Sequence, residues 1–185
     1  MERGKRVIIF VLALAAAAVA LFGCAGMRLV AAEVLGLSTG REQRKVSKDL
    51  GVDVLDAEVI SSEDSHGGFH GDGMTFVVLH FDEDGLAEQL EGLAGWHPLP
   101  LSENAGILIY GYDTEKMKTG PYLCDEQGQG MIPQIQNGYY YFYDRHSESR
   151  DVYDDTYIFD RGSYNFTLAI YDADSGMLYY AKLDT

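Results

Sequence analysis

Cysteine is almost absent from this 185-residue chain, which contains only Cys24 and Cys124. Cys24 lies in an apolar stretch near the N-terminus, so the remainder of the chain has a single thiol and cannot form an internal disulfide. We therefore expect the folded region to be stabilised by a hydrophobic core alone, for which about 135 residues suffice.

Basic residues are scarce beyond residue 48. Residues 49–185 contain six Lys and Arg against twenty-six Asp and Glu, a net charge of −20, whereas residues 1–48 carry a net charge of +5. A strongly acidic domain is repelled by nucleic acid and by anionic lipid head groups. This balance argues against a nucleic-acid partner.

Only one long apolar run occurs, Val7–Met27, and it contains no charged residue. Basic residues flank it on both sides. A helix of this length spans roughly the 30 Å hydrocarbon core of a bilayer. We therefore predict that residues 1–28 form a cytoplasmic tail and a single-pass transmembrane anchor in the cell membrane, and that the rest of the chain is extracytoplasmic.

Two other interpretations of this run stay open. Leu21-Phe22-Gly23-Cys24 is similar to a lipoprotein signal, in which the thiol of Cys24 is the lipidation site, although Phe22 is large for its position. Ala18-Val19-Ala20 follows the A-x-A pattern of a cleaved secretory signal. All three interpretations place the remainder across the membrane. The basic residues after the run also leave the inverted orientation open.

The polar remainder divides into two parts. Residues 29–50 are helix-compatible and rich in basic side chains, and we predict a juxtamembrane helical stalk there. Residues 51–185 are predicted to form one acidic extracytoplasmic domain.

Apolar periodicity within that domain predicts both strands and helices. Met74–Phe81 is apolar on both faces, which is typical of a central strand covered on both sides. Leu86–Gly95 has the apolar spacing of a helix, and Ser102 is a suitable N-cap for a second helix over 103–112. Strands are predicted at 54–60, 74–81, 139–143, 166–171 and 177–183, with a rigid connector at 96–100 and an irregular connection at 119–138. The prediction is an α+β fold whose antiparallel-dominated sheet has about five strands and both helices on one face.

The loop His66–Gly73 carries the residue types of a metal site. His66, His70 and Asp72 are ligand types that Zn²⁺ uses, so a zinc-dependent hydrolase or a metal-binding envelope protein is one hypothesis. The other is a glycine-rich loop whose polar side chains bind its own backbone. Asp172–Gly176 begins like a Ca²⁺ loop but lacks the later ligands, and we interpret it as a hairpin turn.

All thirteen tyrosines lie from Tyr110 onward. A tyrosine has a flat apolar ring and a polar tip, so a tyrosine-rich sheet face can bind a carbohydrate or a protein partner. The same residues can instead form the core of a small sheet, and we favour that interpretation.

Following the strands up and down predicts that the glycine-rich loop and the segment after Tyr143 emerge at the same, membrane-distal edge of the sheet. Long loops held together by a rigid scaffold often carry binding sites. The predicted binding patch comprises His66, Phe69, His70, Asp72, Arg145 and His146. We recognise no nucleophile or cofactor loop and assign no catalytic residue, so we expect a binding module rather than an enzyme.

Three segments of the domain resemble those of a known protein family. The segments HGGFHGDG at 66–73, GYYYFYDRHS at 138–147 and NFTLAIYD at 165–172 resemble a family of small proteins from Gram-positive gut bacteria that have one N-terminal apolar segment. No activity comes with this resemblance. It implies only a membrane-anchored or lipoprotein-like protein of the bacterial cell envelope.

Overall fold

The computed structural model describes residues 40–67, 71–82, 85–115 and 118–185. The run Val7–Met27, with the lipidation candidate Cys24, lies outside these residues, as do Phe69 and His70. Within the described ranges, no helix is both long enough and apolar enough to cross a bilayer.

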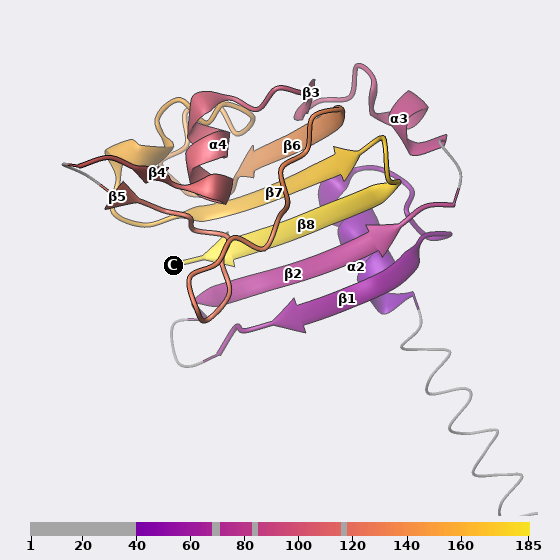
Figure 1. The fold of residues 1–185 in the computed structure, drawn as a ribbon, viewed down its shortest axis with the longest axis horizontal. Coiled ribbons are helices and arrows are strands. Elements are labelled where there is room, and N and C mark those ends of the chain that lie inside the picture. The colour runs from indigo at the N-terminus through magenta and orange to yellow at the C-terminus, as the bar shows by residue number, and fades with distance from the viewer. Residues whose placement is uncertain (1–39, 68–70, 83–84, 116–117) are drawn as a thin grey trace, which may run out of the picture. The chain divides into compact units, whose positions relative to one another are not determined.

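A six-stranded antiparallel sheet forms the centre of the domain (Figure 1). Its spatial order is β1-β2-β8-β7-β6-β3. The strands are β1 (Glu58–Asp64), β2 (Gly73–His80), β3 (Trp96–Pro98), β6 (Gly138–Asp144), β7 (Asn165–Asp172) and β8 (Met177–Asp184). The predicted α+β class with an antiparallel sheet is confirmed.

Two details of the strand prediction differ. β1 begins four residues later than predicted, because Val54 and Ala57 close a turn through a backbone hydrogen bond of 3.2 Å. Leu55 is 50% exposed in that turn. The predicted connector at Trp96 is instead the short edge strand β3, which pairs with β6. The sheet therefore has six strands.

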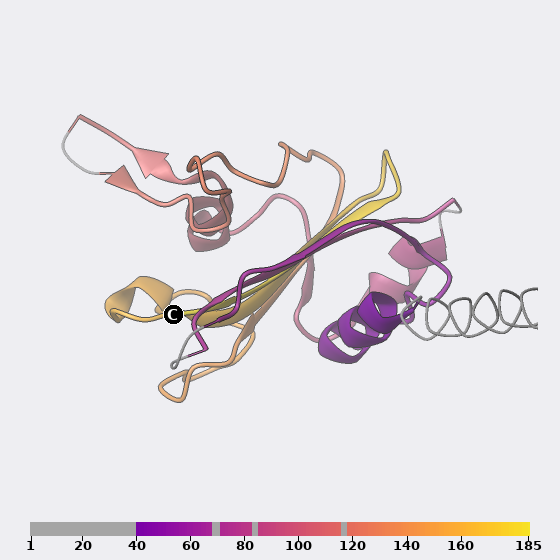
Figure 2. The same cartoon turned by 90° about the horizontal axis from the view of Figure 1, so that it is seen from below.

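Helices cover both faces of this sheet. Figure 2 shows α2 (Arg41–Leu50) and α3 (Gly85–Leu90) on one side and α4 (Glu103–Tyr110) on the other. The prediction of both helices on one face is wrong. Val77 and Leu79 of β2 belong to the core cluster beneath α2 and α3, whereas Phe76 and Val78 belong to the cluster beneath α4. A strand that is apolar on both faces requires cover on both sides.

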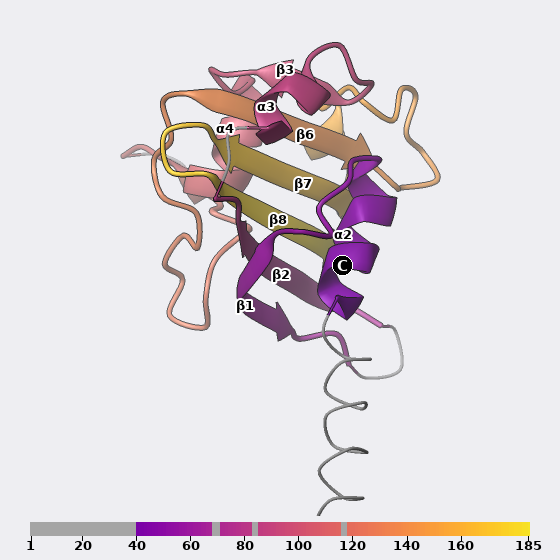
Figure 3. The same cartoon turned by 90° about the vertical axis from the view of Figure 1, so that its right-hand side faces the viewer.

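Helix α2 lies where the stalk was predicted, yet it packs into the domain. Val46 is fully buried and Leu50 is 3% exposed, both against the sheet. The Gln43 side chain donates to the Ala57 carbonyl at 3.1 Å. Figure 3 shows α2 across the sheet, with its C-terminal end toward the end of β6. From Glu42 onward the helix therefore belongs to the same compact unit as the sheet rather than to a free stalk.

The remaining connections lie around these layers. The predicted helix after Leu86 is short, because α3 ends at Leu90 and Gly92 takes a φ of +75°. The Ser102 cap is confirmed, since its hydroxyl accepts from the Ala105 amide at 3.0 Å. The other elements are the two-residue strands β4 (Tyr112–Asp113) and β5 (Lys118–Thr119) and the 3-10 helix η1 (Ile158–Asp160).

Candidate functional site

The glycine-rich loop and the segment after β6 emerge at the same edge of the sheet. Gly73, at the start of β2, pairs with Asp184, which in turn pairs with Asn165 at the start of β7. β6 ends beside that same end of β7, because Asp144 pairs with Phe166. The prediction that these loops converge is confirmed, while their distance from a membrane stays a prediction.

Asp184 joins two of the predicted patch residues. Its Oδ1 accepts a hydrogen bond of 2.7 Å from Nη1 of Arg145, and its Oδ2 lies 3.2 Å from Nε2 of His66. Burial raises the pKa of Asp184, but the hydrogen bond and charge of Arg145, together with His66, lower this pKa to below its ordinary value. The Asp184 carboxylate therefore connects the glycine-rich loop to the segment that follows β6.

The other nitrogen of His66 also meets a carboxylate. Nδ1 lies 2.7 Å from Oδ1 of Asp64, and Asp64 in turn lies 3.7 Å from the Lys45 ammonium of α2. Lys45 also donates to the Thr75 hydroxyl at 3.1 Å. Burial raises the pKa of Asp64, but His66 and Lys45 lower it to below its ordinary value. This network connects α2, the loop and the last strand.

The zinc hypothesis is not tested by these contacts. Both ring nitrogens of His66 are engaged by carboxylates, and the side chain of Asp72 is exposed. Among the described residues, no group of three His, Cys, Asp or Glu side chains could hold a metal ion. His70 lies outside those residues, so the His66/His70/Asp72 site stays a prediction. The Asp172–Gly176 segment forms the predicted hairpin turn, and Asp172 accepts from the Ser175 hydroxyl at 2.6 Å.

His146 belongs to a different set of contacts. Its Nε2 lies 3.1 Å from the Ser163 hydroxyl, and its Nδ1 accepts from the Glu148 amide at 3.1 Å. The neighbouring Asp144 is buried and receives two hydrogen bonds from Arg161, at 2.9 and 2.6 Å. This pair holds the 144–161 loop against the end of β6. No local pattern marks these two residues as partners, since sixteen positions separate them in the chain.

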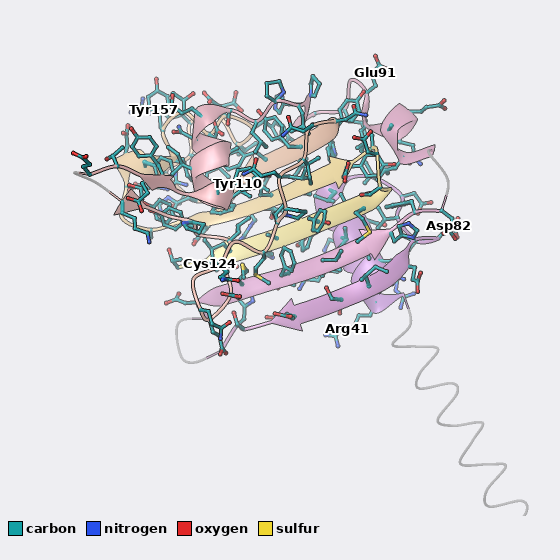
Figure 4. All side chains as sticks on the ribbon, in the orientation of Figure 1. Arg41, Asp82, Glu91, Tyr110, Cys124 and Tyr157 are labelled. Carbon is teal, nitrogen blue, oxygen red and sulfur yellow. The ribbon has the colours of Figure 1, made fainter. Side chains whose placement is uncertain are left out.

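Cys124, the free cysteine of the described region, is half-buried. Figure 4 shows it at the opposite end of the sheet from Asp82. It lines a cavity of 450 Å³ with the two thioether side chains Met74 and Met131.

A cleft lies beside Arg145, on the face that carries α2 and α3. β6 contributes Tyr141 and Tyr143, whose side chains share one face because alternate residues of a strand point the same way, and Arg145 directly follows the strand. The cleft has a volume of 470 Å³. Its other walls are the C-terminal end of α2 at 48–51, the connection at 93–94, Tyr153 and Thr167.

Three tyrosine rings form one continuous wall of this cleft. The rings of Tyr141 and Tyr143 are stacked, with centroids 6.5 Å apart and planes at 9°. Tyr153 meets both edge-on, at centroid distances of 6.4 and 5.5 Å. Gly95 makes this packing possible, because a Cβ there would lie 2.6 Å from the Tyr153 ring and 2.7 Å from the Tyr141 ring. The 144–161 loop thus adds the Tyr153 ring to the wall formed by Tyr141 and Tyr143 of β6.

The wall is fixed from below by the end of α2. Asp49 accepts a hydrogen bond of 2.6 Å from the Tyr180 hydroxyl, and its backbone carbonyl accepts one of 3.3 Å from the Tyr141 hydroxyl. Burial raises the pKa of Tyr141, and the neighbouring Tyr153, Tyr143 and Asp49 raise it further. Burial and Asp49 likewise raise the pKa of Tyr180. Both hydroxyls therefore stay neutral and serve as donors.

Several polar groups around the cleft have no partner within the part of the chain that the structure describes. The Lys48 ammonium and the hydroxyls of Tyr143, Tyr153 and Thr167 form no hydrogen bond or ion pair with another described residue. Thr167, near the start of β7, also lines the cleft. Donors and acceptors that no protein group engages can form hydrogen bonds with a polar ligand in the cleft.

Sequence reasoning found only part of this cleft. Arg145 was in the predicted patch, and the tyrosine run of β6 was noted as a binding face or a core. It is both, because Tyr141 is buried at 4% exposure while Tyr143 is half-buried and lines the cleft. Tyr153 and Lys48 were missed, since only the tertiary packing of a loop and a helix brings them to β6.

Comparison with known proteins gives no further guide to this site, because no family model, no curated protein and no solved structure matches the chain.

Proposed function

We propose that the described domain is a carbohydrate-binding module and that the sugar binds in the cleft between α2 and β6. One observation carries this proposal. Three contiguous tyrosine rings and four unpartnered polar groups line a single cleft of 470 Å³. A sugar ring has apolar faces that pack on an aromatic ring and hydroxyls that require hydrogen-bond partners, so this pairing of surfaces fits it.

The size of the cleft favours a small ligand over a protein partner. Small-molecule sites occupy about 300–1,000 Å³, and this cleft lies within that range. A stable protein–protein interface buries about 800 Å² on each partner. A protein partner is the alternative, and it would have to extend well beyond the cleft.

The experiment is a glycan array probed with the full chain, purified in lauryldimethylamine oxide, a detergent without a sugar head group. We expect retention on at least one oligosaccharide, and loss of that retention in Tyr153→Ala. Tyr112→Ala is the matched control, because Tyr112 is also exposed, at 46% against 38% for Tyr153, and does not line the cleft. Equal retention of the two variants would place any sugar site elsewhere.

We also propose that the module is held at the outer face of a bacterial cell membrane by residues 7–27. The apolar length of this run and the acidic character of residues 49–185 support this location. Protease added to intact protoplasts should then degrade the domain. Protection of the domain until the cells are lysed would rule out the external topology. Loss of membrane association in Cys24→Ala would identify a lipid anchor in place of a transmembrane helix.

A further inference from the structure

We infer that the sugar bound in this cleft is acidic, and that Lys48 recognises its carboxylate. This inference rests on the proposed carbohydrate-binding function and adds the chemical class of the ligand. Lys48 lies at the C-terminal end of α2 and lines the cleft. No carboxylate of a described residue pairs with it.

The charges around the cleft differ from those of the rest of the domain. Residues 49–185 have six basic side chains among thirty-two charged ones, yet the cleft is lined by two cations, Lys48 and Arg145, and one carboxylate, Asp49. That carboxylate is engaged, because Asp49 accepts the 2.6 Å hydrogen bond from Tyr180. Because Arg145 is paired with Asp184, Lys48 is the cation of the cleft that has no carboxylate partner among the described residues.

The two cations have different roles. Nη1 of Arg145 is committed to Asp184, and Nη2 donates to the carbonyls of Phe166 and Leu183 at 3.1 and 2.9 Å. Arg145 is thus a positioning residue that keeps the end of β6 in place. Lys48 is exposed, and its ammonium is not paired with any described residue. It is the cation that can meet a ligand.

The geometry of the rings disfavours a cationic ligand. An aromatic cage binds a quaternary ammonium between separated ring faces. Here Tyr153 meets the Tyr143 ring edge-on, with centroids 5.5 Å apart, so these two rings pack on each other and do not stand apart as two walls of a cage. Lys48 and Arg145 line the same cleft, and their positive charge also disfavours a cation.

The net negative charge of the domain does not prevent this binding. At physiological ionic strength the Debye length is about 8 Å, so carboxylates farther from the cleft are largely screened, whereas a direct contact with Lys48 is not. An exposed ion pair contributes only modestly to the free energy of binding. We therefore expect the carboxylate to improve affinity about threefold to fivefold.

The test is an array of uronic-acid oligosaccharides, each printed beside its carboxyl-reduced, neutral counterpart, and probed with the full chain. We expect threefold to fivefold stronger retention on the acidic member of the pair. Lys48→Gln should remove this difference and leave retention on the neutral member unchanged. Lys118→Gln is the matched control, because Lys118 is also exposed and lies on β5, away from the cleft.

The outcomes separate the two proposals. Equal retention of the acidic and neutral members, or an acidic preference that survives Lys48→Gln, overturns the acidic-sugar inference and leaves the carbohydrate-binding proposal standing. Phosphorylated oligosaccharides are printed on the same array, and stronger retention on them than on the uronic acids overturns the assignment of a carboxylate. If no member of the array shows retention that depends on Tyr153, the proposed function fails and this inference fails with it.

Discussion

The guanidinium of Arg145 and the carboxylate of Asp184 join two strands that are not neighbours in the sheet. Their contact of 2.7 Å links the end of β6 to the end of β8, across β7. Arg145 also donates to carbonyls of β7 and β8, so one side chain fixes the ends of three strands. The same side chain lines the cleft. The edge of the sheet is thus held rigid where we propose that a ligand binds.

Asp184→Asn should destabilise the domain by about 1.5–3 kcal/mol, because Arg145 loses a charged hydrogen-bond partner while partly buried. Urea unfolding measures this change as a lower midpoint. Glu91→Gln is the control, since Glu91 is exposed at the periphery (Figure 4) and should shift the midpoint little. A shift no larger than that of the control would mean that this contact does not stabilise the sheet edge.

Acid should weaken the domain through Asp184 and Asp64. The pKa of each carboxyl is lowered in the folded state, so the stability each contributes is present above the ordinary Asp pKa of 3.8 and is lost as the pH falls through the lower folded value. Between about pH 5 and 2, the urea midpoint of the wild type should fall more than that of Asp184→Asn. Parallel curves would show that Asp184 is not responsible.

Breaking the buried pair Asp144–Arg161 should cost about 3–5 kcal/mol, because Asp144→Leu leaves an uncompensated guanidinium at 10% exposure. The double variant Asp144→Leu/Arg161→Met should be closer to the wild type, since no unpaired charge remains. Chemical unfolding of both variants checks the order. A double variant less stable than the single one would show that the pair itself is required.

Leu50→Ala should destabilise the domain by about 2–5 kcal/mol, because it leaves a cavity between α2 and the sheet at a residue that is 3% exposed. Arg41→Ala, at an exposed position of the same helix, is the control. Thermal or urea unfolding distinguishes the two. If α2 were a free stalk, both variants would unfold like the wild type.

The sequence predicted the parts of the fold that depend on local periodicity. The run at 74–81 that is apolar on both faces, the aromatic run at 139–143 and the hairpin at 166–183 all correspond to observed strands. Which face a helix covers depends on how the chain crosses the sheet, and periodicity within α4 does not contain that information. The same limit explains α2, whose basic composition resembled a stalk although Val46 and Leu50 reach the core.

The candidate site was predictable only at the level of strand order. Up-and-down connections were sufficient to bring His66 and Arg145 to one edge, and Asp184 joins them there. The cleft could not be predicted from strand order alone, because it depends on tertiary contacts of a loop and a helix. Tyr153 reaches β6 because the Asp144–Arg161 pair folds its loop back, and Lys48 reaches it because α2 crosses the sheet. Neither arrangement leaves a pattern in neighbouring residues.

The most direct test of sugar binding in the cleft is a calorimetric titration of the full chain with the oligosaccharide that the array retains best. The wild type and Tyr112→Ala should bind it with the same affinity, whereas Tyr153→Ala should bind about tenfold more weakly, equivalent to about 1.4 kcal/mol. Tyr153→Phe should lose less than Tyr153→Ala, because the ring remains. An affinity that is the same in Tyr153→Ala as in the wild type would contradict the account.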